Sequence, residues 1–232
     1  MNNFTEAYNY SNQVISSNKF VFDTDLTKRY SLNGSTEAVF FLVNETGNTR
    51  FGALRGDFRS DNNLPTLKIS QSSYNVGNVN SNDARKAWYN NTKYPGSIVI
   101  NKYNLDKFQM PVLHLTELKL IRSESAGELN QNIAVAVSDL NQIRLRAYGS
   151  SATPLGINSS AALVISTARM ERQLEMVAEG DRLQQLKRIG AKSETSQIRN
   201  SPWNCPGMVL QFPQGEISNS PDFLKNPEGG CN

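Results

Sequence analysis

The sequence is short of the residues that build the commonest catalytic and metal sites. Its 232 residues include one histidine, His114, and two cysteines, Cys205 and Cys231. A zinc site needs about four ligands, so these residues cannot complete one. The motifs H-E-x-x-H, G-x-S-x-G and G-x-x-x-x-G-K-[ST] do not occur, which argues against a zinc protease, a serine hydrolase and a P-loop protein. We therefore expect no enzyme, no metal and no cofactor, and we expect His114 to pack or to cap a helix.

The sequence also lacks long hydrophobic runs and a strong charge of either sign. No apolar run reaches the length of a transmembrane helix, and the start, MNNFTEAYNY, has neither the charged nor the apolar part of a signal peptide. The net charge is only +3 and Lys and Arg are scattered, which argues against a nucleic-acid partner. The content of 38% hydrophobic and 19% charged residues is typical of a soluble, loop-rich protein. Either the protein is cytosolic, or this chain is a piece whose targeting segment is absent.

The first half of the chain has little periodicity. Residues 4–17 have the spacing of a short helix. Residues 23–111 are mostly irregular and rich in Asn, Ser, Gly and Tyr, with strand-like runs at 38–43 and 97–103. The Tyr and Trp content of this middle region favours an ordered binding surface over disorder.

From residue 113 the periodicity becomes helical. Two apolar stripes on either side of a turn at 130–132 predict a helical hairpin of tetratricopeptide size, which ends at Gly149. A third helix follows a cap at 158–160, Gly180 supplies a left-handed stop, and Gly190 ends a fourth, short helix. The expected fold is mainly α-helical, with long irregular regions and a few short strands. We treat the chain as one region with these segments: a leading helix (1–22), a loop-rich middle region (23–111), the hairpin (112–149), a helix and a short helix (158–190), and an irregular tail (191–232).

Three glutamates, Glu171, Glu175 and Glu179, lie four residues apart and share one helical face, where they repel one another unless they are paired. Two acids could act as the general acid and base of a glycosidase. Such pairs usually lie on loops or strand ends that face a cleft, so we favour structural ion pairs. The candidate partners are the arginines of these helices: Arg122, Arg144, Arg146, Arg169, Arg172 and Arg182.

The two cysteines, Cys205 and Cys231, both fall in the tail. In an oxidising compartment they could form a disulfide, and otherwise they are two free thiols. The sequence leaves both possibilities open. If the mature protein is exported, we expect the bond.

Four segments carry motifs in a fixed order along the chain: PVLHLTELKLIRSESAGELN (111–130), AVSDLNQIRLRAYG (136–149), MERQLEMVAEGDRLQQLKRIG (170–190) and FPQGEISNSPDFLKNP (212–227). Together they resemble the SusD/RagB family of surface nutrient-binding lipoproteins. The matching positions are Glu117, Arg122, Glu124, Asn141, Arg144, Arg146, Glu171, Arg172, Glu175, Glu179, Gly180, Arg182, Leu186, Lys187, Arg188 and Gly190. NDARKAWY (82–89) is similar to the family's D-x-R step. The departures are Leu183 for an aromatic residue, Gln185 for Asp and His114 for Arg.

The resemblance implies a protein on the extracellular face of the outer membrane that captures a glycan or another oligomer. It implies as a partner a TonB-dependent, SusC-like transporter beneath it. The resemblance covers only the C-terminal half of such a protein. It also implies that the protein is attached to the membrane through a lipid anchor alone, and this anchor is absent from this chain. The alternative is a tetratricopeptide-like protein-interaction module without a small ligand, although the chain has few helical pairs for one.

Capture of a sugar requires aromatic faces, with amides and charged groups for the hydroxyls. The middle region supplies Trp88, Tyr89, Tyr74 and Tyr94 as candidates. Each ring could instead pack against the hairpin. We expect Trp88 to be the main stacking residue, so that Trp88→Ala lowers affinity with little change in melting temperature, and we expect Trp203 in the tail to be structural.

Overall fold

The structure is a computed structural model that describes residues 2–45, 57–193, 197–198 and 201–219, together with residues 222, 224, 226, 229 and 231. The chain divides into two compact units. The large unit is Asn3–Ala178, and the small unit is Glu179–Asn232 with Met1–Asn2. The segment expected at 158–190 therefore continues from one unit into the other.

The long helices of the large unit lie where the periodicity predicts them. They are α1 (Phe4–Ser16), α4 (Leu115–Leu129), α5 (Ile133–Tyr148) and α6 (Ala161–Glu175). His114 caps α4, because its Nδ1 accepts a hydrogen bond from the amide of Glu117 at 3.4 Å. In the turn before α5, Asn130 and Asn132 adopt left-handed φ angles of 50° and 54°, which Asn tolerates better than most residues. The predicted hairpin and the capping role of His114 are confirmed.

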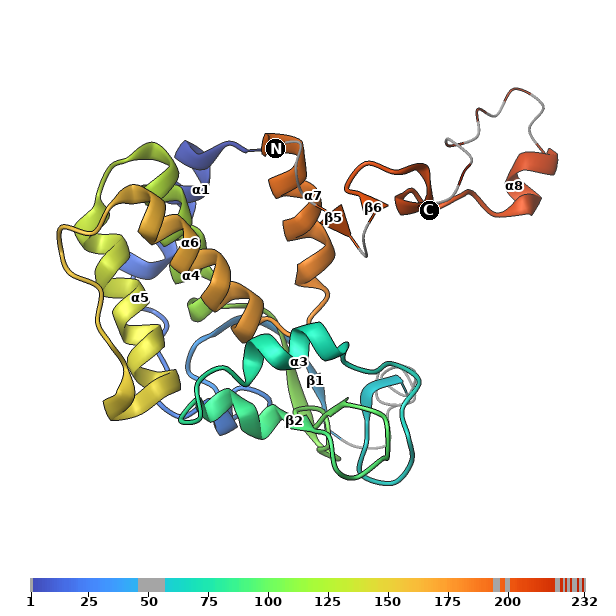
Figure 1. Cartoon of the computed structure of the whole chain (residues 1–232), viewed down its shortest axis with the longest axis horizontal. Helices are drawn as coiled ribbons and strands as arrows, with labels where there is room; N and C mark the ends of the chain where they lie inside the picture. The colour runs from blue at the N-terminus through green and yellow to red at the C-terminus, as the bar shows by residue number, and fades with distance from the viewer. Residues whose placement is uncertain are drawn as a thin grey trace. The chain divides into compact units, whose positions relative to one another are not determined.

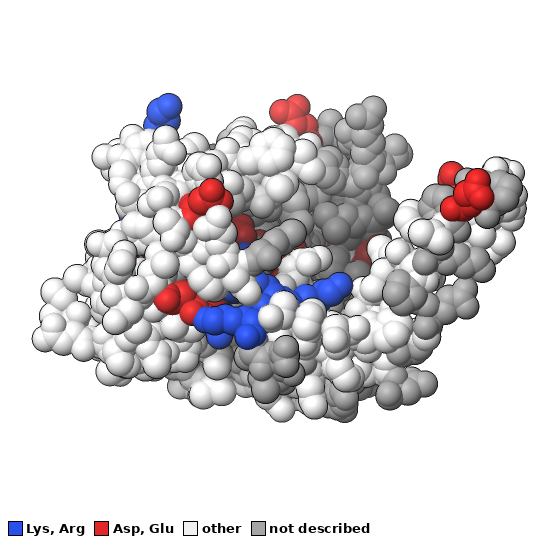
Figure 2. Space-filling model, turned by 90° about the horizontal axis from the view of Figure 1, so that it is seen from above, with Lys and Arg blue, Asp and Glu red and all other residues white. Residues whose placement is uncertain are grey.

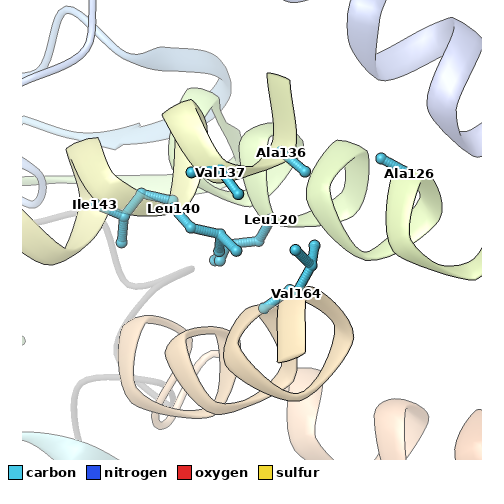
Figure 3. Close-up of a cluster of buried hydrophobic side chains, with 8 residues drawn as sticks. Leu120, Ala126, Ala136, Val137, Leu140, Ile143 and Val164 are labelled. Atoms are coloured by element: carbon cyan, nitrogen blue, oxygen red, sulfur yellow. The ribbon is translucent and has the colours of Figure 1, made fainter. Parts of the chain in front are cut away.

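An aliphatic cluster holds these helices together. It comprises Leu120 and Ala126 of α4, Ala136, Val137, Leu140 and Ile143 of α5, and Val164 and Ala168 of α6. In Figure 3, Leu120, Leu140 and Val164 point toward one another between the three helices. Gly127 lets α4 and α6 approach closely, since a Cβ there would lie 2.7 Å from Cγ1 of Ile165. Burial of these side chains, at about 25 cal/mol per Å² of apolar surface, makes the three helices one body.

Short elements fill the segment between α1 and α4 (Figure 1). They are η1 (Leu26–Lys28), β1 (Ala38–Asn44), α3 (Gln71–Gly77), η3 (Ala84–Trp88), β2 (Tyr89–Asn90), β3 (Val99–Ile100) and β4 (Phe108–His114), and a further turn of 3-10 helix, η4 (Gly149–Ser151), follows α5. Antiparallel pairs join β1 to β4 and β2 to β3. The strand at 38–43 is confirmed. The strand predicted at 97–103 shrinks to β3, because the chain turns where the amide of Asn104 donates to the carbonyl of Asn101 at 2.9 Å. The mainly α-helical fold with a few short strands is confirmed.

The small unit contains α7 (Asp181–Ser193), β5 (Gln197–Ile198), β6 (Ser201–Pro202), η5 (Pro206–Met208) and α8 (Gln214–Asn219). Cys205 and Cys231 form a disulfide across a Cα–Cα distance of 5.4 Å, which is the pairing expected if the protein is exported. Gly180 precedes α7 with a φ of 79°, as the left-handed stop requires. The resembling segment 212–227 lies partly outside the described residues.

The expectation that Gly190 ends a helix is wrong. α7 continues through Gly190 to Ser193, and a Cβ at Gly190 would lie 2.2 Å from Cγ of Trp203. The glycine is therefore needed for close packing of the Trp203 ring against the helix. The structural role expected for Trp203 agrees with this contact.

Candidate functional site

Glu175, the middle member of the glutamate stripe, is fully buried at the end of α6. Its carboxylate lies 2.8 Å from Nη2 of Arg29, 3.2 Å from Nη1 of Arg85 and 3.0 Å from Nη2 of Arg146. Burial alone raises the pKa of a carboxyl group, but the charges of Arg146, Arg29 and Arg85 outweigh it and lower the pKa of Glu175 from 4.5 to about 2. Glu175 is therefore an ionised group at neutral pH.

The same arginines contact further acids. Arg85 binds Glu171 and Asp83, each at 2.8 Å, and Arg29 binds Glu37 at 3.0 Å. Arg146 also reaches Glu37, at 3.3 Å. We call this set the buried ion network: Arg29, Glu37, Asp83, Arg85, Arg146, Glu171 and Glu175. It joins the loop-rich region to α5 and α6, because its members come from both.

Tyr148 at the end of α5 extends the buried ion network. Its hydroxyl donates to Glu171 at 3.0 Å and accepts from Arg85 at 2.8 Å. Burial raises the pKa of Tyr148 to about 12; the nearby Arg85 works against this rise, and the acids Glu171 and Asp83 add to it. The phenol thus stays protonated and acts as a hydrogen-bond donor.

The carboxylates of the network serve structure and not acid–base chemistry. Arginines cover Glu171 and Glu175, and a general acid needs an open approach to its substrate. The ion pair predicted between Glu175 and an arginine of the hairpin is confirmed, with Arg146 as the partner. Glu179 belongs to the small unit, so its pairing stays a prediction.

The other predicted arginines have different partners. Arg122 binds Asp139 of α5 at 2.7 Å, and Arg144 donates to the carbonyl of Thr153 at 3.1 Å. Neither is described in contact with the glutamate stripe. Arg182 lies exposed on α7 of the small unit. Sequence reasoning missed Arg29 as a member of the network, whereas the D-x-R step had marked Asp83 and Arg85.

Two of the predicted stacking residues are core residues. Trp88 and Tyr89 are only 7% and 9% exposed. The ring of Trp88 meets Tyr30 edge to face at 6.2 Å and carries Arg29 at 5.7 Å from its centroid. The reason is local: Asp83 caps η3 and binds Arg85, so the residues that follow turn inward. Trp88 and Tyr89 are therefore not exposed sugar platforms, contrary to expectation.

Tyr74 and Tyr94 are half-buried at the surface. Tyr74 lines a hollow of about 330 Å³, which we call the Tyr74 hollow; its other walls are Lys68, Ile69, Gln71, Asn91, Gly96, Ser97 and Ile98. It combines an aromatic face with amide, hydroxyl and ammonium groups. Tyr94 lies outside this lining, and its hydroxyl donates to the carbonyl of Ser60 at 2.9 Å. Tyr94 is thus held by the loop that it packs on.

A second hollow borders the buried aromatic cluster. This Trp88 cavity has a volume of about 420 Å³ and is lined by Thr24, Asp25, Leu26, Thr27, Tyr30, Ala84, Ala87, Trp88, Asn101, Lys102, Leu105 and Arg146. Sequence reasoning found only Trp88 among its aromatic walls. Tyr30 and Lys102 come from distant segments, and no local motif marks them.

The surface and the side-chain inventory limit the chemistry further. On the face seen in Figure 2 most of the described residues are uncharged; one group of Lys and Arg lies near its centre, and a further basic residue projects at the upper left. Within the described ranges, no group of His, Cys, Asp and Glu is placed to hold a metal ion. No helix of the described residues is long and apolar enough to cross a membrane.

A packed helical body that carries a long, loop-rich segment with surface hollows defines the class of this protein. The chain belongs to the SusD family, whose model matches residues 6–205. No curated protein shows significant sequence similarity to it.

Solved structures share the fold at low sequence identity. The surface glycan-binding protein A from Bacteroides uniformis is 17% identical with a TM-score of 0.73, over 96% of this chain and 56% of that protein. A SusD superfamily protein from Bacteroides vulgatus is 21% identical with a TM-score of 0.76, over 97% of this chain and 55% of that one. NanU from B. fragilis is 17% identical with a TM-score of 0.71, over 97% and 58%. The chain thus spans little more than half the length of these proteins.

Proposed function

We propose that this chain is the part of a surface nutrient-binding protein that contributes a glycan-binding face. Membership in the SusD family supports this function, as does the fold shared with a surface glycan-binding protein. The observation that carries the proposal is the Tyr74 hollow, in which one aromatic ring and several hydrogen-bonding side chains meet at the surface. Stacking on the ring and hydrogen bonds to hydroxyls are the interactions that hold a sugar.

Binding fits this chain better than catalysis does. Buried arginines neutralise Glu171 and Glu175, so the acid pair that a glycosidase requires is committed to the fold. The working partner in this proposal is a TonB-dependent outer-membrane transporter, and a lipid anchor holds the protein on the extracellular face. Co-purification of the transporter with the full-length protein from outer membranes tests the partnership, and a protein that purifies alone under mild detergent contradicts it.

The glycan face is tested on the full-length protein with a panel of neutral oligosaccharides and calorimetry. We expect Tyr74→Ala to weaken binding about tenfold, because loss of one stacked ring removes on the order of 1 kcal/mol. Gln71→Ala, at an exposed position, should weaken it less. Tyr10→Ala is the matched control, since Tyr10 is 66% exposed on α1 and lines neither the Tyr74 hollow nor the Trp88 cavity. Unchanged affinity in both hollow variants would place the glycan site elsewhere.

A further inference from the structure

Arg144 is the one arginine of α4, α5 and α6 that has no carboxylate partner among the described residues. The other arginines of these helices bind acids at distances between 2.6 and 3.0 Å: Arg122, Arg146, Arg169 and Arg172. Arg144 instead donates from Nη2 to the carbonyl of Thr153 at 3.1 Å, and its guanidinium lies 5.7 Å from the ring centroid of Tyr148. These contacts orient the side chain but leave its charge without a counterion in the described part of the chain.

The side chain of Arg144 lines a hollow of about 340 Å³ in the large unit, which we call the Arg144 hollow. Its other walls are Val76, Val79, Asn80, Tyr148, Ser151, Thr153, Met170 and Leu174. None of these described residues is acidic. Val79 is 86% exposed and Met170 is 48% exposed, so apolar surface faces water beside the guanidinium. A ligand with a carboxylate and an apolar body would cover this surface and supply the missing counterion.

The acids of the buried ion network act against an anion in this hollow, but from a distance. Glu171 and Glu175 lie on the same helix as Met170 and Leu174, yet both are buried and both bind Arg85. Tyr148 donates its hydroxyl to Glu171 at 3.0 Å, on the side away from the hollow's cation partner. Electrostatic energy falls with distance, so a carboxylate in direct contact with the guanidinium gains more than it loses to acids that arginines already neutralise.

We propose that the Arg144 hollow binds a small monocarboxylate with an aromatic or branched apolar body. The carboxylate lies on Arg144, whose planar guanidinium can give it two parallel hydrogen bonds, and the body lies against Tyr148, Met170 and Leu174. The volume of about 340 Å³ is in the usual range of small-molecule pockets. A single cation in the lining favours one carboxylate over two. This site is separate from the Tyr74 hollow and does not depend on the function proposed for that hollow.

Calorimetry on the full-length protein with 3-phenylpropionate, 3-phenylpropanamide and acetate tests the proposal. The amide keeps the apolar body without the charge, and acetate keeps the charge without the body. We expect 3-phenylpropionate to bind at least about tenfold more tightly than either of the other two. Arg144→Gln should remove the preference for the acid over the amide. Lys19→Gln is the matched control, because it makes the same change of charge at an exposed position outside the hollow.

A second pair of variants tests the hollow itself without touching the cation. Val79→Trp fills the hollow from an exposed position and should abolish binding of 3-phenylpropionate. Val21→Trp is its control, since Val21 is 63% exposed and lies outside the lining. The melting temperature of each variant shows whether it is folded.

The outcomes separate this site from the glycan face. Equal affinity for the acid and the amide, no binding of 3-phenylpropionate, or full affinity in Val79→Trp overturns the proposal. Equal binding of acetate overturns the role of the apolar walls. If Arg144→Gln fails to fold, Val79→Trp still decides the matter. Val79→Trp should leave the affinity for neutral oligosaccharides unchanged, because Val79 is not in the lining of the Tyr74 hollow, so failure at one site does not imply failure at the other.

Discussion

The two halves of the large unit bury their side chains in different ways. Helices α4, α5 and α6 meet through aliphatic residues and alanines, and their backbone groups are satisfied within each helix. The loop-rich segment instead buries a cluster centred on Trp88, Tyr30 and Tyr103, with Arg29 and Lys102 against the rings. Its backbone relies on side chains: Ser60, for example, bonds Ile100 and Asn104.

This difference shows why the buried ion network lies where it does. Loops without a continuous ladder of hydrogen bonds need a strong fixed point on the helical body. Arg29 and Arg85 from the loops meet Glu171 and Glu175 of α6 at that point. The helices share a continuous aliphatic cluster and add ion pairs such as that of Arg122 with Asp139, whereas the loops depend on charge pairs and on a few large rings.

The largest loss of stability is expected at Trp88, the largest ring in the core of the loop-rich segment. Trp88→Ala should lower the free energy of unfolding by about 4 kcal/mol, since removal of a buried Trp leaves a cavity and also removes the surface on which Arg29 and Lys102 lie. Chemical denaturation measures this, with Tyr10→Ala as the exposed control. The burial of Trp88 thus reverses the expectation from sequence. A loss below about 1 kcal/mol would show that the ring is no part of the core.

The charge pairs are tested by Glu175→Gln. The lowered pKa means that the ionised form stabilises the fold above pH 4.5 and that this contribution is lost as the pH falls toward 2. The substitution should cost on the order of 3 kcal/mol at neutral pH, because three arginines lose their shared carboxylate. The difference between the two proteins should shrink as the pH falls from about 4.5 to 2. A pH-independent difference would contradict the linkage.

The helical half is more predictable from sequence than the loops, and the reason is physical. α1, the hairpin and α6 follow from apolar spacing and caps, because each contact lies within a few residues along the chain. Glu171 and Glu175 share a face of α6 as their spacing predicts, whereas Glu179 lies beyond the end of that helix. Arg29 pairs with Glu175 and Lys102 bonds Tyr30, and both partners lie far along the chain, so the local sequence does not indicate these roles. Gly190 was misjudged for the same reason, since its partner Trp203 lies in another element.

The small unit shows a third kind of stabilisation, since a disulfide between Cys205 and Cys231 joins two parts of its chain. Cys205→Ser with Cys231→Ser should destabilise this unit by about 2 to 3 kcal/mol, as expected for a disulfide across a sequence separation of 26 residues. Limited proteolysis should then cut within residues 201–219 faster, while fragments of 3–178 persist at the original rate. Equal cleavage rates before and after the change would show that the bond is not needed for the fold of this unit.

The smallest effect is expected at Tyr94. Tyr94→Phe keeps the ring and removes the hydrogen bond to the carbonyl of Ser60, so it should cost about 1 kcal/mol of stability. Glycan affinity should not change, because Tyr94 is absent from the lining of the Tyr74 hollow. A tenfold loss of glycan affinity with unchanged stability would contradict this and would indicate that Tyr94 contacts the glycan.

The attachment of the loops at Arg85 also bears on how such a protein can diversify. Arg85 fixes one point of the loop-rich segment to α6 and Tyr148, and the exposed positions 91–93 lie several residues beyond it. Changes in length or sequence at 91–93 leave the attachment intact and cost little loop-closure entropy. We therefore expect that most variants in a library randomised at 91–93 still fold. In a library randomised at 83–85 we expect few folded variants. Residues at 91–93 can thus change during evolution, and with them the ligand that is bound, without loss of the fold.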